Sequence, residues 1–266
     1  MRDIVMVVGS GMMGSGIGAM SALAGNKTVL VDTSAERAEN GRKKAIECIR
    51  LREENELNTH EEAEKAIELL STSDDSIKTA VNARLVIEAI IENVEAKQNL
   101  FAQLDAVLPV EVPICSNTSG LRITDISAKC VHPERTVTTH FWLPAHLVPL
   151  VEVVMGDKTD EAVAVAVRDE LRKWKKAPVL VKRDLPGQLA NRVFQAIIRE
   201  SIDIVASGLA SAEDVDTAIS CGMAMRFPVW GPLKHLDAIG LNLGLSVQET
   251  VLPSICADKT ASPYIK

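Results

Sequence analysis

A glycine-rich turn near the amino terminus constrains the fold of this chain more than any other feature. An apolar run, Ile4–Val8, leads directly into Gly9, Gly11 and Gly14, and a segment rich in small residues follows. A continuous apolar run bounded by glycine is typical of a strand buried on both faces of a parallel sheet. Glycines at this spacing permit a tight turn, a close backbone approach to a ligand and close packing of the next helix. The pattern predicts a strand–turn–helix unit that binds phosphate groups at the helix amino terminus.

An acidic residue further along indicates which phosphate compound binds. Asp32 ends a second apolar strand, Thr28–Val31, at about the usual 20 residues from the turn. A carboxylate there accepts hydrogen bonds from ribose hydroxyls and repels a 2′-phosphate. Because no arginine follows Asp32 immediately, we expect NAD as the cofactor rather than NADP. A tight turn followed by a capping aspartate, without a ligand, is the alternative interpretation.

Composition and charge limit the remaining possibilities. The 266 residues are 47% hydrophobic, which is enough apolar material for one large domain and one smaller domain. The net charge of −7 argues against nucleic acid as a partner, because phosphate backbones require a basic surface. No apolar run is long enough to span a bilayer and no targeting segment precedes the first strand, so we expect a cytoplasmic protein without membrane contact. The five cysteines are scattered and form no C-x-x-C pair, so we expect neither a disulfide framework nor a metal site.

Strands and helices alternate along the chain as far as Asp184. The further expected strands are 84–90, 112–116, 136–141, 150–154 and 179–181, and the expected helices are 12–24, 35–57, 61–70, 95–107, 123–128 and 161–175. The second and third of these helices form a hairpin insert at about 35–70, longer than a plain crossover requires. From Asp184 onward the pattern is only helical, with helices at 188–206, 212–219 and around 233–245. We therefore predict an α/β Rossmann-type amino-terminal domain, 1–183, and a smaller all-α carboxyl-terminal domain, 184–266.

Two further motifs resemble those of a known family. Cys115-Ser-Asn-Thr-Ser-Gly120 and His140-Phe-Trp-Leu-Pro144 are similar to segments of the short-chain L-3-hydroxyacyl-CoA dehydrogenases. The supporting matches occur in the family's order across the chain: Glu88-Ala-Ile-Ile-Glu-Asn93, Pro149-Leu-Val-Glu-Val153, Leu185-Pro-Gly187, Asn191-Arg192 and Gly231-Pro232. The resemblance implies an NAD-dependent oxidoreductase of fatty acid metabolism that acts on a small-molecule substrate such as 3-hydroxybutyryl-CoA. It also implies that the helical domain contacts the substrate and pairs two subunits into a homodimer.

The resemblance assigns catalytic roles to His140 and Glu152. Oxidation of a secondary alcohol requires a base for the hydroxyl proton, and imidazole titrates near neutral pH. A carboxylate on the other ring nitrogen fixes the tautomer and stabilises the imidazolium that forms. Ser119 matches the family serine that contacts the substrate hydroxyl, with a turn or helix-capping residue as the alternative. Asn191 matches an asparagine that reaches the site from the second domain, with a buried structural amide as the alternative.

Cofactor contacts are expected from the glycine turn and from three later positions. Beyond Gly9, Gly11, Gly14 and Asp32, the expected contacts are Met12, Met13, Glu92, Lys97 and Asn117. Glu92 and Lys97 match family positions near the nicotinamide ribose. Charges that flank a helix start are also compatible with a solvated surface, which is the alternative for both residues.

Two departures from the family pattern bear on activity. The family usually reads His-Phe-Phe-Asn-Pro, and its asparagine hydrogen-bonds near substrate and cofactor, whereas this chain has Leu143. Loss of a donor that stabilises developing charge costs on the order of 10²-fold in rate; alternatively, Leu143 marks a different position of the substrate carbonyl. The family also commonly ends in Lys-Thr-Gly-x-Gly-Phe-Tyr, which this sequence lacks. We therefore expect either a truncated chain or a site that closes differently.

The acyl-CoA assignment is less constrained than the dehydrogenase assignment. The hairpin at 35–70 corresponds to the family's CoA cradle, and Arg50 and Arg52 are candidates for a CoA phosphate or for a solvated helix face. The segment from Pro149 to Glu152 also resembles relatives that oxidise L-gulonate, L-carnitine or an aldehyde of pyridoxine breakdown. A third alternative is a non-catalytic NAD-binding relative similar to the lens crystallin of the family. The absence of asparagine at position 143 favours that alternative, and the retention of both His140 and Glu152 argues against it.

Overall fold

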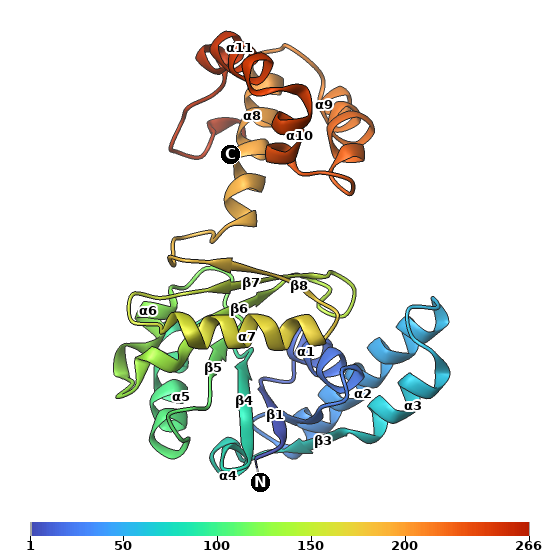
Figure 1. The fold of residues 1–266 in the computed structure, drawn as a ribbon, viewed down its shortest axis with the longest axis vertical. Coiled ribbons are helices and arrows are strands. Elements are labelled where there is room, and N and C mark those ends of the chain that lie inside the picture. The colour runs from blue at the N-terminus through green and yellow to red at the C-terminus, as the bar shows by residue number, and fades with distance from the viewer. Residues whose placement is uncertain (1, 266) are drawn as a thin grey trace. The chain divides into compact units, whose positions relative to one another are not determined.

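An eight-stranded sheet organises the first of the two units into which the chain divides, Met1–Leu189 and Ala190–Lys266. The structure, a computed structural model, describes residues 2–265. The strands are β1 (Ile4–Val8), β2 (Lys27–Val31), β3 (Leu70–Ser73), β4 (Ala83–Glu88), β5 (Ile114–Ser116), β6 (Thr136–Phe141), β7 (Leu150–Val154) and β8 (Ala177–Val181). They lie in the order β3-β2-β1-β4-β5-β6-β7-β8 (Figure 1). The first six strands are parallel, β7 is antiparallel to β6, and β8 is parallel to β7.

Helices cover both faces of this sheet. They are α1 (Met12–Leu23), α2 (Ala35–Glu54), α3 (His60–Glu68), α4 (Ser76–Ala80), α5 (Val94–Val107), α6 (Ile123–Ile126) and α7 (Glu161–Lys173). Side chains alternate across a strand, so Val5 and Val7 of β1 join a buried cluster with α1, α2, α3 and α7. Met6 and Val8 join a second cluster with α4, α5 and α6 on the other face. The sequence prediction of an α/β Rossmann-type domain is confirmed.

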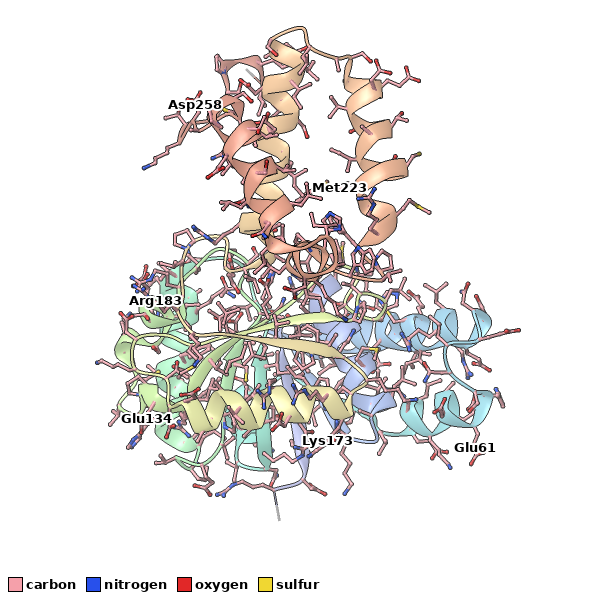
Figure 2. The ribbon with its side chains drawn as sticks, turned by 45° about the horizontal axis from the view of Figure 1, so that its top comes forward. Glu61, Glu134, Lys173, Arg183, Met223 and Asp258 are labelled. Atoms are coloured by element: carbon pink, nitrogen blue, oxygen red, sulfur yellow. The ribbon has the colours of Figure 1, made fainter. Side chains whose placement is uncertain are left out.

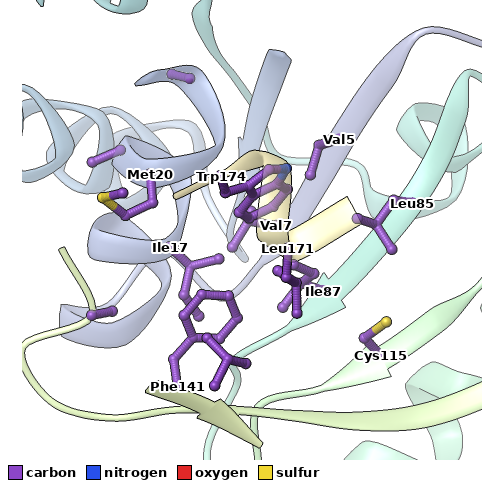
Figure 3. Close-up of a cluster of buried hydrophobic side chains, with 14 of the residues drawn as sticks. Val5, Val7, Ile17, Met20, Leu85, Ile87, Cys115, Phe141, Leu171 and Trp174 are labelled. Atoms are coloured by element: carbon purple, nitrogen blue, oxygen red, sulfur yellow. The ribbon is translucent and has the colours of Figure 1, made fainter. Parts of the chain in front are cut away.

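The largest buried cluster fixes the strands that carry the candidate site. Figure 3 shows Trp174, which follows α7, packed among Leu171, Val7 and Phe141. The rings of Phe141 and Trp174 lie 6.4 Å apart between centroids. Charged side chains such as Glu61 and Lys173 lie on the outside of this unit (Figure 2). Phe141, the residue after His140, therefore packs the end of β6 against the core.

One strand and one α-helix of the first unit are missing from the sequence prediction. β3 occupies Leu70–Ser73, where the predicted third helix was expected to end, and α4 follows at Ser76–Ala80. Only Leu70 of β3 is buried, because β3 is an edge strand and pairs with β2 alone. A half-exposed edge strand of serine and threonine carries no apolar periodicity that a sequence prediction can use.

The second unit is entirely helical, as predicted for the fold class. Its α-helices are α8 (Ala190–Ala206), α9 (Ala212–Ala218), α10 (Pro232–Ile239) and α11 (Leu241–Val251). Gly240 separates the last two with a φ of 89°, a left-handed conformation that glycine adopts readily. Within residues 2–265, none of the helices combines the length and apolarity that crossing a membrane requires.

Candidate active site

The glycine turn leaves the amino terminus of α1 open. Gly9 adopts a φ of 93°, and a Cβ on Gly14 would lie 1.8 Å from the carbonyl oxygen of Gly9. Both positions therefore require glycine. Gly11 caps α1 without a side-chain hydrogen bond, and a Cβ there would meet open space. The first N–H groups of α1 are consequently available to a ligand, and a helix amino terminus favours an anionic one.

Asp32 is tied to the glycine turn by hydrogen bonds. Its Oδ2 accepts from the Ser10 backbone N at 3.0 Å and from Ser10 Oγ at 2.8 Å, and its Oδ1 accepts from the Thr33 N at 2.8 Å. Burial raises the pKa of Asp32, but the hydrogen bonds from Thr33 and Ser10 outweigh burial and hold that pKa below its usual value. The carboxylate therefore stays ionised at the carboxyl end of β2, next to the turn.

An arginine from the first turns of α2 contacts Asp32. Arg37, in the first turns of α2, places its Nε 3.0 Å from Asp32 Oδ1, and its side chain is largely exposed. The Ser34 hydroxyl caps α2 and accepts from the Arg37 backbone N. No arginine follows Asp32 directly in the sequence, as expected, but Arg37, five residues later, lies beside the carboxylate in space.

His140 and Glu152 form a buried pair on neighbouring strands. They are directly opposed in the antiparallel register of β6 and β7, and His140 Nδ1 lies 2.7 Å from Glu152 Oε2. Glu152 is fully buried, and it also accepts from Trp142 Nε1 at 3.1 Å and from the Leu189 backbone N at 2.9 Å. These N–H donors favour the charged form of the carboxylate, and a charged carboxylate can stabilise a neighbouring imidazolium.

A second ionic cluster lies at the carboxyl ends of β4 and β5. The ammonium of Lys97 lies 2.5 Å from Glu88 Oε1, and both side chains are buried. Ser116 Oγ donates to the other Glu88 oxygen at 2.6 Å. Burial raises the pKa of Glu88 despite the opposing charge of Lys97. The alternative of a solvated surface charge is therefore wrong for Lys97, which lies inside the fold.

Glu92 connects this cluster to the segment that follows β5. It accepts from Thr118 Oγ1 at 2.5 Å and from the backbone N of Gly120 at 3.1 Å, and it lies 3.4 Å from Lys97 Nζ. The Ser119 backbone N also donates to Glu92, and the Ser119 side chain is exposed. The structure therefore brings Glu92, Lys97 and Ser119 together at one edge of the sheet.

The remaining predicted residues fall into three groups. Asn117 Oδ1 accepts from the Phe141 backbone N at 2.9 Å, which joins the end of β5 to β6 beside His140. Met12 is exposed next to the glycine turn, whereas Met13 packs against the core. Asn191 lies at the start of α8 in the second unit.

Comparisons with known proteins agree with this geometry over nearly the whole chain. The family described as "3-hydroxyacyl-CoA dehydrogenase, NAD binding domain" matches residues 4–185, and the corresponding "C-terminal domain" matches residues 187–265. The chain belongs to the 3-hydroxyacyl-CoA dehydrogenase family. The first unit is accordingly an NAD-binding domain, and the chain is an NAD-dependent oxidoreductase with a small-molecule substrate. The predicted family, cofactor and fold class are confirmed.

Relatives within the family differ in their substrates. The 5-formyl-3-hydroxy-2-methylpyridine 4-carboxylate 5-dehydrogenase of Mesorhizobium japonicum is 32% identical over 98% of this chain and 86% of its own length. The 3-hydroxybutyryl-CoA dehydrogenase of Bradyrhizobium diazoefficiens is 33% identical over 96% of this chain and 85% of its own length. A crystal structure of the pyridine carboxylate dehydrogenase, described as an NAD⁺-dependent dismutase, superposes with a TM-score of 0.85 at 30% identity, covering 99% of this chain and 84% of that one.

Two cationic side chains of this dehydrogenase, Lys176 and Arg52, bind the segment that follows β6. Lys176 Nζ donates to the carbonyl oxygens of Ala145 at 2.5 Å and Val148 at 2.8 Å, and Arg52 donates to that of His146 at 2.5 Å. Burial, assisted by the charge of Arg52, lowers the pKa of Lys176 to about 8. Three carbonyl groups of one short segment are thus fixed by two side chains from distant elements.

This segment forms one wall of a cavity in the first unit. The cavity has a volume of about 620 Å³ and lies between α1, α2 and residues 143–146. Its lining includes the apolar side chains of Met12, Leu51 and Leu143 and the ammonium-bearing Lys44. The departure from the family at position 143 therefore adds apolar surface to a cavity wall.

Several residues of the site are absent from the sequence prediction. They are Ser10, Arg37, Glu88, Ser116, Trp142 and Lys176. A signal existed for two of them. Glu88 is a charged residue directly after the apolar run Leu85–Ile87. Trp142 stands two positions after His140, a spacing that places side chains on the same face of an extended segment.

Proposed function

We propose that this dehydrogenase interconverts a short-chain L-3-hydroxyacyl-CoA, such as 3-hydroxybutyryl-CoA, and the corresponding 3-oxoacyl-CoA. The observation that carries the proposal is the 2.7 Å contact between His140 Nδ1 and Glu152 Oε2. A carboxylate only accepts hydrogen bonds, so Nδ1 carries the proton and Nε2 keeps its lone pair. His140 therefore acts through Nε2 as the general base in oxidation and as the general acid in reduction.

Glu152 orients His140 and stabilises the imidazolium. Opposite charges about 4 Å apart attract by about 4 kcal/mol at an effective dielectric constant of about 20. Glu152 supplies this charge without reorganisation, because its donors Trp142 and Leu189 already hold it in place.

The residues of the glycine turn fit a dinucleotide. The open position at Gly11 and the uncapped start of α1 suit the pyrophosphate, and Asp32 suits the adenosine ribose. Bound NAD supplies the hydride acceptor or donor. Glu92, with Lys97 behind it, and Asn117 border the nicotinamide end in this proposal. Ser119 and Asn191 are proposed to position the substrate hydroxyl and carbonyl.

The acyl-CoA substrate is supported by the cavity beside α1. The apolar part of its lining suits an acyl-pantetheine arm, and Lys44 suits a phosphate, while Glu47 and Glu54 also line the cavity. The Bradyrhizobium relative, which is named a 3-hydroxybutyryl-CoA dehydrogenase, aligns with 96% of this chain.

A specific observation favours a second candidate substrate, which is a free hydroxy acid or an aldehyde. Arg50 is paired with Glu53 and Glu64, and Arg52 donates to Asn58 and His146. Neither arginine then offers its full donor set to a CoA phosphate. The Mesorhizobium relative is named for a pyridine carboxylate aldehyde, which carries no CoA. A non-catalytic, crystallin-like role is disfavoured because the His140–Glu152 pair is complete.

A homodimer through the second unit is also part of the proposal. α8 is amphipathic, yet its side chains are at most half-buried within the chain, and about half of the surface of Val193 and Phe194 is exposed. Obligate dimer interfaces are rich in such apolar surface. Light scattering is expected to give twice the mass of one chain; a monomer at micromolar concentration would refute this point.

The substrate assignment is tested with a panel of acetoacetyl-CoA, free acetoacetate, small aldehydes and the corresponding hydroxy compounds, each assayed with NAD(H). We expect acetoacetyl-CoA to be reduced at least tenfold more efficiently, as kcat/KM, than any compound without CoA. Turnover of a free hydroxy acid or aldehyde with no detectable turnover of acetoacetyl-CoA would replace the CoA assignment by the second candidate. No turnover of any compound, by a folded protein that binds NADH, would support the crystallin-like role.

A further inference from the structure

Trp142 contacts the His140–Glu152 pair directly. Its Nε1–H donates to Glu152 Oε2 at 3.1 Å, the same oxygen that lies 2.7 Å from His140 Nδ1. The indole and imidazole rings lie 5.8 Å apart between centroids at an interplanar angle of 49°. The backbone N of Leu189 donates to the other oxygen of Glu152 at 2.9 Å. Trp142 therefore supplies one of the donors that surround this buried carboxylate.

The indole donor distinguishes this chain from the usual family motif. The family reads His-Phe-Phe-Asn-Pro, and phenylalanine at position 142 has an aromatic ring of similar shape but no N–H group. Replacing it by tryptophan keeps the apolar contact and adds one hydrogen bond to Glu152. The added bond lies next to the proton that His140 shares with Glu152.

We propose that Trp142 is a positioning residue for the His140–Glu152 pair, because its indole N–H fixes the orientation of the Glu152 carboxylate. The inference rests on the proposed function only in that His140 carries the proton transfer. The terminal torsion of a glutamate side chain is broad and twofold, so hydrogen bonds must select its orientation. Hydrogen bonds on both oxygens, from His140 and Trp142 to Oε2 and from Leu189 to Oε1, hold the plane of the carboxylate and so orient His140.

The indole also competes with His140 for the charge of Oε2. Each added donor spreads the negative charge of a carboxylate over more hydrogen bonds, which weakens the others. Removal of the indole N–H therefore has two separate consequences. The carboxylate becomes less well oriented, and its remaining bond to His140 Nδ1–H becomes stronger.

The test compares Trp142→Phe with Trp174→Phe as a matched control. Trp174 Nε1 donates to Glu170 Oε1 at 3.2 Å, so the control loses the same kind of bond outside the His140–Glu152 pair. For Trp142→Phe we expect kcat to fall about three- to tenfold while KM and NADH affinity stay within twofold of the parent (about 0.4 kcal/mol). A purely structural role would lower activity in step with thermal stability, and Trp174→Phe would do so equally. That result, or a parent-like kcat in Trp142→Phe, would overturn the proposal.

A nuclear magnetic resonance measurement on the ligand-free enzyme needs no substrate. The Nδ1–H proton of His140, assigned through its absence in His140→Gln, is expected to move downfield in Trp142→Phe and to stay in place in Trp174→Phe. If Trp142→Phe does not fold, the parent chain still decides the question. Its Trp142 indole N–H resonance is expected to shift as His140 is titrated, while that of Trp174 does not. An indole resonance at Trp142 that ignores this titration would overturn the proposal even in an enzyme whose substrate proves to be different.

Discussion

Replacement of Glu152 by glutamine removes the charge beside His140 and leaves the shape of the side chain nearly unchanged. Glu152 is fully buried, and the N–H groups of His140, Trp142 and Leu189 are among those that face it. Glutamine has one acceptor oxygen, so at least one donor loses its partner, at a cost of about 1–3 kcal/mol in stability. The imidazolium loses a charge interaction of about 4 kcal/mol, which corresponds to a fall of about 10³-fold in kcat.

The assay follows nicotinamide absorbance at saturating substrate and cofactor, with melting temperature measured on the same preparations. We expect KM and NADH affinity in Glu152→Gln to stay within about threefold of the parent, because the residue acts on proton transfer. Glu170→Gln is the matched control, since Glu170 also accepts an indole N–H but lies outside the His140–Glu152 pair. A loss of less than tenfold in kcat for a folded Glu152→Gln protein would refute the reasoning.

Three further predictions follow from the described contacts. Gly14→Ala places a Cβ 1.8 Å from the Gly9 carbonyl, so we expect NADH binding to weaken at least 100-fold in a fluorescence titration; retained affinity would contradict the geometry of the turn. Asp32→Asn removes the charge at the ribose site and leaves Arg37 unneutralised, so we expect the preference for NADH over NADPH to fall about tenfold, whereas an unchanged ratio of dissociation constants would contradict the role of Asp32. The pKa of Lys176 is lowered to about 8, so the unfolded chain binds more protons than the folded chain above that pH. The free energy of unfolding of the parent is therefore expected to rise by about 3 kcal/mol between about pH 8 and pH 10.5. Denaturation of Lys176→Met should lack this rise, and an identical pH dependence would contradict the burial of the ammonium.

Much of the fold could be predicted because its signals are local. The run Ile4–Val8 followed by three glycines specifies a buried strand, a turn and a helix without any distant contact. The strands that carry His140 and Glu152 are short runs rich in β-branched residues, and the structure gives both the bounds expected from the sequence. β3 was not predicted because it is an edge strand with a single buried side chain, Leu70, which gives no apolar pattern in the sequence.

The ionic contacts of the site could not be predicted from local patterns. Arg37 reaches Asp32 only because α2 starts at Ala35 and turns its first residues back toward β2. Lys97 looks like a helix surface charge in the sequence, but the packing of α5 against β4 buries it against Glu88. Such pairs depend on how elements pack, and a charge pattern alone gives no information about burial.

The most direct test of the central claim is a single-turnover measurement with His140→Gln. Enzyme and NADH are mixed with acetoacetyl-CoA, or with whichever compound of the substrate panel the parent reduces, and loss of nicotinamide absorbance gives the rate of the chemical step. Our account predicts a fall of at least 10³-fold in this rate, with NADH affinity within threefold of the parent. A His140→Gln enzyme that turns over within a few-fold of the parent would show that proton transfer does not depend on the pair formed by His140 and Glu152.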